Sequence, residues 1–305
     1  MSGMSILTPL TVTDAMLSSC TVTEPDSTGT EIAWVTGTTY ALKDRRYYLH
    51  KIYERVVAGA GAITPDLDTT NWAYVKPTNR WSSLDNVIGT STTAATSPLT
   101  YVFVPGQGIG GVYFAELLGK SVTVSMKDRP GGNTVYNTTV NLDGSLISSI
   151  YDWLFVEYLQ KTDTVLTDLP SQWPACELTV TVASTTAVAC GVIKFGYLLA
   201  VGVTTYGAKV GILSYGKKTK DAYGNYSFLD RGYARKGDFS VVISKADFNK
   251  IFRLLSGYSV TPAVYIGSDV GGLEPLIVYG VFQDFYIVVD NFLTQTCTLQ
   301  IEGLI

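Results

Sequence analysis

The segment that decides how the first third of this chain folds reads Trp34…Tyr40…Tyr47-Tyr48…Tyr53…Asn71-Trp72-Ala73-Tyr74…Pro77-Thr78-Asn79-Arg80-Trp81. Gly, Asp and Pro turn residues separate these rings, so the segment does not have the pattern of an ordinary core strand. It predicts either a small module with an aromatic core or a flat binding platform. Trp34 and Trp72 are expected in the core, because a module of about 45 residues has little else to bury.

The whole chain is weakly charged and apolar. Charged residues make up only 16 % of its 305 residues, and the mean hydropathy is +0.20. No run of about 18 apolar residues occurs, so we expect no membrane span. The most apolar window, residues 196–203, is too short to cross a bilayer. Residues 1–5 lack the basic start and apolar run of a secretory signal, and none is expected.

An apolar chain of this kind must bury its apolar surface in a large β core or between the subunits of an assembly. Because monomers rarely expose large apolar patches, the composition favours a homo-oligomer. The net charge of −4 argues against a nucleic-acid partner. One local group of basic residues is interleaved with Asp221 and Asp230, which favours a solvated hairpin. It consists of Lys217, Lys218, Lys220, Arg231, Arg235 and Lys236.

The cysteines are widely spaced along the chain. They are Cys20, Cys176, Cys190 and Cys297. With no Cys-x-x-Cys pair and a single histidine, the sequence argues against a zinc site or any other metal site. Without a secretory signal, we expect four reduced and mostly buried thiols.

Short runs with a period of two recur between turn signals and are rich in β-branched residues, which predicts antiparallel sheet. The clearest runs are residues 121–125, 178–182, 239–243 and 298–301. Turns are predicted at residues 128–132, 142–144, 221–225 and 271–272.

One helix is predicted after Ser244-Lys-Ala-Asp247, which has the form of a capping box. Phe248, Ile251, Phe252 and Leu255 follow at helical spacing, and Gly257 marks the end of the helix. A second and weaker helical pattern covers residues 146–154.

These patterns predict an all-β protein in three parts. Residues 1–97 would hold a small, aromatic-cored, three-stranded module and end in a Ser/Thr/Ala linker. Residues 98–192 and 193–305 would form two antiparallel, jelly-roll-like β-sandwich domains, the second carrying the short helix. Because residues 187–203 read as a nearly continuous strand, these two domains could share a sheet.

The motifs with possible chemistry favour structural interpretations. Residues 106–111 match the G-x-G-x-x-G pattern of dinucleotide sites, but no long helix follows, so we expect a loop and no cofactor. His50 is the only imidazole, and its neighbours predict a packed or surface residue on a strand rather than a general base. Asp66, Asp68 and Asn71 lack the Gly and distal Glu of a calcium loop and favour an Asx turn. No pattern signals a pair of catalytic carboxylates, so we expect no enzyme.

The aromatic segment resembles small chitin-binding-type carbohydrate-binding modules in its order of Trp, Tyr followed by Asp, Tyr, Pro and Trp. The residues that carry this resemblance are Trp34, Tyr40, Asp44, Tyr53, Pro65 and Trp72. It implies three short strands around a minute core, with one face that stacks on sugar rings. Tyr47, Tyr48 and Tyr74 are then the exposed candidates for binding a glycan such as a host surface polysaccharide.

Longer motifs are similar to structural proteins of tailed bacteriophages and prophages. They lie at residues 9–17, 71–85, 207–214, 218–225, 230–233, 278–285 and 301–304. The resemblance implies a non-enzymatic tail or baseplate adaptor that helps to attach fibres. Its partners would be other tail or baseplate subunits and further copies of the chain. It would be located in the virion tail, and in the host cytoplasm during assembly. A glycan-binding tail protein that recognises a host receptor is the alternative.

Overall fold

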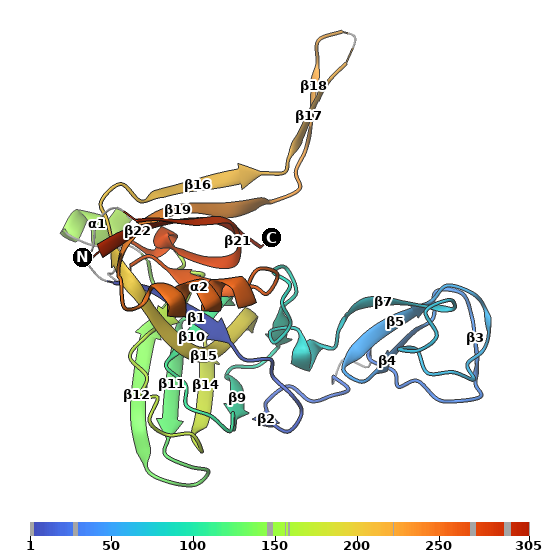
Figure 1. Cartoon of the computed structure of the whole chain (residues 1–305). Helices are drawn as coiled ribbons and strands as arrows, with labels where there is room; N and C mark the ends of the chain where they lie inside the picture. The colour runs from blue at the N-terminus through green and yellow to red at the C-terminus, as the bar shows by residue number, and fades with distance from the viewer. Residues whose placement is uncertain are drawn as a thin grey trace.

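The computed structural model describes residues 3–26, 30–144, 149–155, 157, 159–221, 223–268, 273–289 and 294–304. Figure 1 shows an aromatic module on one side, a β-sandwich and a barrel in the body, and a long ribbon that projects from the barrel. The prediction of an all-β protein is therefore confirmed.

The sandwich begins with a five-stranded sheet of order β12-β11-β14-β9-β2. Its strands are β2 (Leu17–Cys20), β9 (Leu99–Phe103), β11 (Ser121–Lys127), β12 (Thr134–Asn141) and β14 (Glu177–Ala183). The opposing layer consists of β8 (Thr92–Ala94), β10 (Gly111–Leu118), β13 (Thr164–Leu166) and the first half of β15 (Val188–Thr204). Alternate residues of both layers, such as Val124 and Phe195, meet in one hydrophobic core.

The second half of β15 leaves the sandwich and enters a six-stranded barrel of order β15-β1-β20-β21-β22-β19. The other strands are β1 (Gly3–Pro9), β19 (Tyr233–Ser244), β20 (Ala263–Ile266), β21 (Ile277–Val288) and β22 (Thr294–Gly303). Pairing of Val203 with Val242 and of Thr204 with Val241 closes the ring. The expected second sandwich thus takes the form of a closed barrel, because β15 pairs with both β1 and β19.

The pairing of the first two strands of the chain differs from the expected domain boundary at residue 97. β1 pairs with β15 and β20 in the barrel, and β2 pairs with β9 in the sandwich, so neither strand belongs to the aromatic module. The sequence of β1 does not indicate these partners, which lie about 200 residues or more further along the chain. The nearly continuous strand expected at residues 187–203 is confirmed as β15, which the sandwich and the barrel share.

The aromatic module contains a three-stranded sheet of order β4-β5-β7 and a small two-stranded sheet, β3-β6. Its strands are β3 (Thr39–Tyr40), β4 (Arg45–Tyr48), β5 (Lys51–Arg55), β6 (Gly59–Ala60) and β7 (Trp72–Pro77). A 3₁₀ helix, η1 (Asn79–Trp81), follows β7, and Trp81 packs against the sandwich core. The three short strands around an aromatic core were predicted from the sequence.

The predicted C-terminal helix is confirmed as α2 (Phe248–Gly257), which packs Ile251 and Leu255 against the interior of the barrel. Ser244 Oγ accepts a hydrogen bond from the Asp247 N–H in the turn before the helix, whereas the helix is capped at Asp247, whose side chain makes no capping hydrogen bond. The weaker helix is α1 (Ile150–Phe155), although residues 146–148 of the predicted range lie outside the described residues. A second 3₁₀ helix, η2 (Glu274–Leu276), precedes β21.

Several other local predictions are confirmed, and one is wrong. Residues 106–110 connect β9 to a strand, β10, and not to a helix, so they form a loop. The predicted turns at 128–132 and 221–225 connect β11 to β12 and β17 to β18. At the turn expected over 142–144, Asp143 instead forms an antiparallel β-bridge with Gln160, and residues 271–272 lie outside the described residues. All four thiols are free and three are buried, and burial raises the pKa of each.

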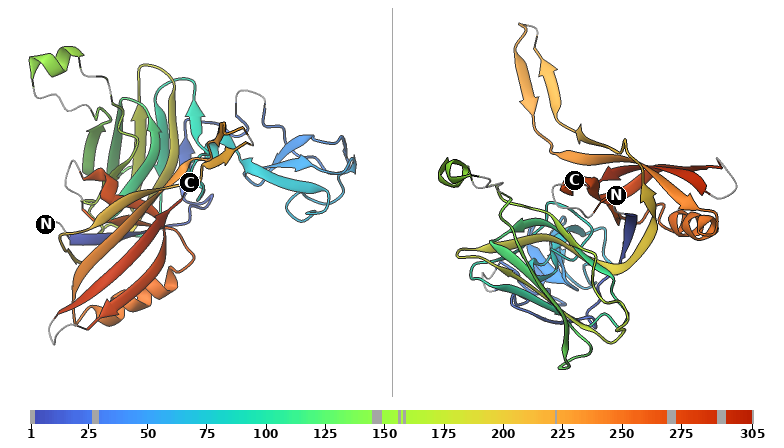
Figure 2. Two further views of the ribbon diagram at one scale, coloured as in Figure 1. Left: turned by 90° about the horizontal axis from the view of Figure 1, so that it is seen from above. Right: turned by 90° about the vertical axis from the view of Figure 1, so that its left-hand side faces the viewer.

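The projecting ribbon, which we call the arm, comprises residues 206–233. It contains β16 (Lys209–Ser214), β17 (Lys217–Lys220) and β18 (Tyr226–Leu229). β16 pairs with β19 at the rim of the barrel, and β17 and β18 form a separate hairpin beyond it. The views in Figure 2 show this hairpin extending away from the body.

Candidate interaction surfaces

The core of the aromatic module is made of rings. Tyr40, Tyr53 and Trp72 are buried, and Trp34 and Tyr48 pack against them at partial exposure. Tyr40 meets Trp72 edge-on at 5.1 Å between ring centroids. The buried guanidinium of Arg55 covers the Trp72 ring at 5.0 Å and forms an ion pair with Asp68 at 3.6 Å. These contacts place Trp72 at the centre of the core, as the sequence predicted.

The three tyrosines predicted to bind a glycan do not form one platform. Successive residues of a strand point to opposite faces, so Tyr47 and Tyr48 face opposite sides of the module. The register pairs Tyr48 with Lys51 and Tyr53 with Tyr74, which puts Tyr48 and Tyr74 on one face. The Tyr48 ring packs edge-on against Trp34, with 5.6 Å between ring centroids, whereas the Tyr74 side chain is 53 % exposed. Tyr74 is therefore the candidate that is open for stacking.

Asp68 shapes the loop before β7, as the predicted Asx turn requires. Its carboxylate accepts hydrogen bonds from the backbone N–H and the side-chain amide of Asn71, and its backbone carbonyl accepts from the Trp72 N–H. The second carboxylate oxygen faces Arg55. This carboxylate is thus used within the protein, which supports the turn rather than a calcium site.

His50 lies in the two-residue turn between β4 and β5, and not on a strand as expected. Its Nδ1 is 2.7 Å from an oxygen of Glu24, and its Nε2 is 2.9 Å from an oxygen of Asp14. The ring also lies on Trp81, with 4.4 Å between centroids. Both nitrogens are occupied, so His50 joins the module to the N-terminal segment and to η1.

This turn predicts a stabilising substitution. Leu49 and His50 both have positive φ, 46° and 65°, as a type I′ turn requires, and a leucine is strained in that region. We expect Leu49→Asn to stabilise the module by about 1 kcal/mol, because Asn tolerates this conformation. Hydrogen exchange of β4 and β5 measures the effect. Leu42→Asn is the matched control, since Leu42 is equally exposed at 59 % and is not among the residues with positive φ. Equal protection in both variants would contradict the prediction.

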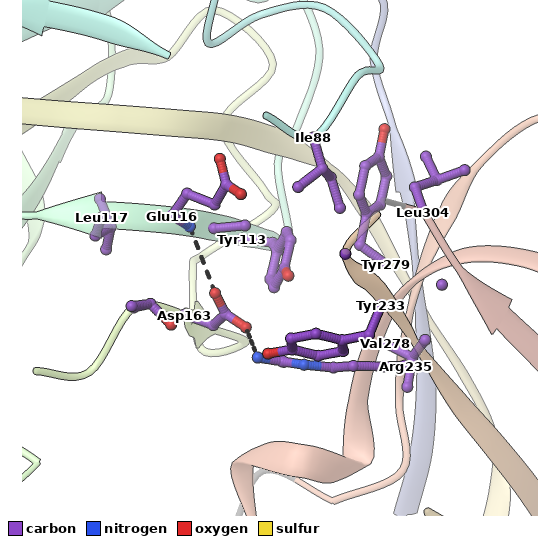
Figure 3. A pocket seen from close by; sticks show the side chains of 14 residues that line it. Ile88, Tyr113, Glu116, Leu117, Asp163, Tyr233, Arg235, Val278, Tyr279 and Leu304 are labelled. Carbon is purple, nitrogen blue, oxygen red and sulfur yellow. Dashed lines mark hydrogen bonds and ion pairs between the residues drawn. The ribbon is translucent and has the colours of Figure 1, made fainter. Parts of the chain in front are cut away.

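A groove of about 510 Å³ separates the sandwich from the barrel (Figure 3). Three tyrosines from distant strands line it: Tyr113, Tyr233 and Tyr279. Asp163 forms an ion pair with Arg235 across the groove and also accepts a hydrogen bond from the Glu116 N–H at 3.4 Å. No sequence pattern predicts this groove, because its lining comes from strands that are separated along the chain, such as β10, β19 and β21.

The charged side chains of the groove are hydrogen-bonded or ion-paired within the protein. Asp163 and Arg235 neutralise each other, and Glu116 accepts a hydrogen bond from the Gly89 N–H at 3.2 Å. Burial raises the pKa of Tyr113 and Tyr279, so their hydroxyls stay protonated. The described lining contains neither His nor Cys, the residues that most often serve as base or activated nucleophile.

Lys194 is a buried cation on β15. Its ammonium donates hydrogen bonds to the Leu84 carbonyl and to Asn86 Oδ1, both at 3.0 Å, and to the Asp85 carbonyl. Burial lowers the pKa of Lys194 from its ordinary 10.5 to about 8, and Asp85 opposes that shift. Lys194 thus fixes the loop after η1 onto the sandwich.

This shift predicts how stability depends on pH. Below pH 8 both the folded and the unfolded chain carry the proton, and the folded state bears the cost of burying the charge. Between pH 8 and 10.5 only the unfolded chain holds it, so the stability of wild type relative to Lys194→Met should rise with pH, by up to about 3 kcal/mol. Urea denaturation of both proteins across this range measures the difference. A difference that does not change with pH would be inconsistent with a buried ammonium.

The arm is an extended ribbon with many exposed apolar side chains. Every residue of β16, β17 and β18 is exposed. Large apolar side chains lie along its whole length, including Tyr206 (87 % exposed), Ile212 (72 %), Tyr223 (92 %), Tyr226 (61 %) and Phe228 (69 %). The solvated hairpin predicted from the basic residues is confirmed. The structure shows in addition that the hairpin exposes large apolar side chains.

A second exposed apolar feature is helix α1. Its exposed side chains are Ile150 (80 %), Tyr151 (70 %), Leu154 (59 %) and Phe155 (67 %). Tyr151 and Phe155 stack on each other at 4.7 Å, one helical turn apart. Figure 2 shows that this helix projects from the sandwich and lies apart from the hairpin of the arm.

Comparisons of the chain with protein-family models, with curated proteins and with solved structures return no significant match. Among the described residues, no helix has the length and apolar character needed to span a membrane.

Proposed function

We propose that this protein is a non-enzymatic structural subunit of a tailed-phage particle, located in the tail or baseplate, that assembles with copies of itself and with other tail proteins. The observation that carries the proposal is the arm. A two-stranded ribbon is only marginally stable by itself in water, and an exposed apolar edge strand is a template for pairing with another chain. An arm of this length and composition is suited to being buried in an assembly.

The sequence motifs and the body of the protein support the same function. The motifs that resemble tail proteins include residues 207–214, 218–225 and 230–233, and all three ranges lie in the arm. The body is a sandwich and a barrel that share β15, which makes a rigid support for a projecting element. In the groove between them, Asp163 and Arg235 are paired with each other, and Glu116 accepts a hydrogen bond from the Gly89 N–H.

Two measurements test this function. Mass spectrometry of purified phage particles that encode the chain should find it in several copies, and labelled antibodies should bind the tail in electron micrographs. The full-length protein should form oligomers in analytical ultracentrifugation. The proposal fails if the chain is missing from purified particles and also stays monomeric.

A second candidate function, glycan binding by the module, is favoured by Tyr74. The exposed Tyr74 ring lies 6.1 Å from the Tyr53 ring between centroids, and the Lys51 Nζ atom lies 6.0 Å from the Tyr74 centroid. An apolar face and a cation therefore lie together. Stacking on a sugar would make Tyr74→Ala lower the affinity for host polysaccharide at least about tenfold, the size of one stacking contact. Tyr47→Ala, on the opposite face, is the matched control. Glycan arrays with both variants provide the measurement, and equal binding by both would rule out this face.

A further inference from the structure

The arm and helix α1 are complementary in charge. The arm, residues 206–233, contains five Lys or Arg and two Asp or Glu, a net charge of +3. The segment that carries α1, residues 143–168, contains five Asp or Glu and one Lys; Asp163 and Lys161 are ion-paired with Arg235 and Glu274 outside it, and the other four acidic residues leave a net charge of −4. Opposite charges of this size favour encounter between the two surfaces and disfavour contact of either surface with itself.

The two surfaces are also complementary in their apolar character. The arm presents Tyr226 and Phe228, stacked at 6.1 Å on β18, and α1 presents Tyr151 and Phe155. Aromatic side chains of this kind form the energetic centres of protein interfaces when they are buried together. Contact between the two surfaces would thus bury the apolar side chains of each against those of the other. Among the described residues, neither surface is covered in this way.

Within one chain the two surfaces do not meet. Figure 1 and both views of Figure 2 place the hairpin of the arm and α1 at separate positions on the body. A contact between them must therefore join two molecules, and each molecule then has one arm to give and one α1 to receive it. Such a head-to-tail contact is heterologous and generates a ring when its rotation closes.

We propose that the partner of the arm is a second copy of this chain, and that the arm of one copy docks on helix α1 of the next. This inference rests on the proposed function, since it names the contact by which the structural subunit would assemble. The contact joins two different surfaces of two identical chains. An arm-to-arm contact, or binding of the arm to a membrane or a nucleic acid, would be a different mode of association.

Two charge substitutions test the contact in the full-length protein. Phe228→Glu on the arm and Phe155→Glu on α1 each place a carboxylate at the centre of one surface, and both side chains are largely exposed, so the fold should be retained. Each substitution should weaken self-association about 30-fold or more, the size of a hot-spot loss. Leu67→Glu, at a position 74 % exposed on the module, is the matched control and should associate as wild type does.

Mixing the two variants separates the proposal from its alternatives. In a head-to-tail contact, the intact arm of Phe155→Glu can still dock on the intact α1 of Phe228→Glu. The mixture should therefore give one-to-one dimers in analytical ultracentrifugation, while each variant alone stays monomeric. The double charge reversal Lys217→Glu and Lys218→Glu should reproduce the effect of Phe228→Glu without altering any ring.

Three results would overturn the proposal. Wild-type association by Phe155→Glu would show that α1 is not the acceptor, while the proposed structural function would still stand. Failure of the mixture to form dimers would exclude a head-to-tail contact. A wild-type protein that stays monomeric at about 100 μM, or whose arm binds anionic vesicles or DNA instead, would exclude a second copy as the partner.

Discussion

Gly202→Val is expected to prevent the barrel from closing and to lower the free energy of unfolding by about 3 kcal/mol or more. Gly202 lies on β15 where that strand contacts both β1 and β19. A Cβ atom at this position would lie 2.3 Å from the Val242 carbonyl oxygen, and a backbone atom in a closed ring cannot move aside as a side chain can. The closure that makes the C-terminal part a barrel therefore depends on a residue without a side chain.

Thermal unfolding and hydrogen exchange of β15 and β19 measure this effect. Gly211→Val is the matched control, because Gly211 also lies in a strand, β16, and a Cβ atom there meets nothing within 4 Å. We expect that control to change stability by no more than about 0.5 kcal/mol. Similar exchange protection in the two variants would show that the barrel tolerates a side chain at Gly202.

Trp72→Ala should unfold the aromatic module while the sandwich and the barrel stay folded. Trp72 is 2 % exposed and contacts both Tyr40 and the Arg55 guanidinium, so its removal leaves a cavity and an uncovered buried cation. Loss of a buried Trp costs about 3–5 kcal/mol. A module of about 45 residues has little more stability than that to lose.

Limited proteolysis tests this prediction, because cleavage should become confined to residues 39–77 while the rest of the chain resists. Tyr74→Ala is the control on the same strand, since Tyr74 is exposed and contributes little to the core. If Trp72→Ala resists proteolysis as Tyr74→Ala does, then the aromatic core is not the main source of the stability of the module.

Local patterns correctly predicted most of the individual elements. The period-two runs became β11, β14, β19 and β22, and the apolar residues at helical spacing from Phe248 onward became α2. Such predictions succeed because burial of alternate residues or of one helix face depends on a few neighbouring residues. The aromatic core around Trp72 was predicted for the same reason, since a short segment can bury little other than its own rings.

The placement of functional groups was predicted less well. His50 was expected on a strand, but it occupies a left-handed turn position that its sequence neighbours do not reveal. Its partners, Asp14 and Glu24, lie 36 and 26 residues earlier in the chain. Tyr47, Tyr48 and Tyr74 were grouped by residue type, but the strand register separates Tyr47 from the other two.

The sequence by itself determined the all-β class, the aromatic module and the presence of a hairpin at residues 217–229, because each depends on local periodicity and turn chemistry. Only the tertiary structure decided that β1 joins β15, that β15 also pairs with β19, and that the arm is left without a covering layer. Those outcomes depend on pairings between strands that lie up to about 200 residues apart. Backbone hydrogen bonds in a sheet do not depend on residue identity, so the sequence of a strand does not name its partner. The aromatic stretch from Trp34 to Trp81 therefore determined its own small core, whereas the closure of the barrel followed from long-range pairing.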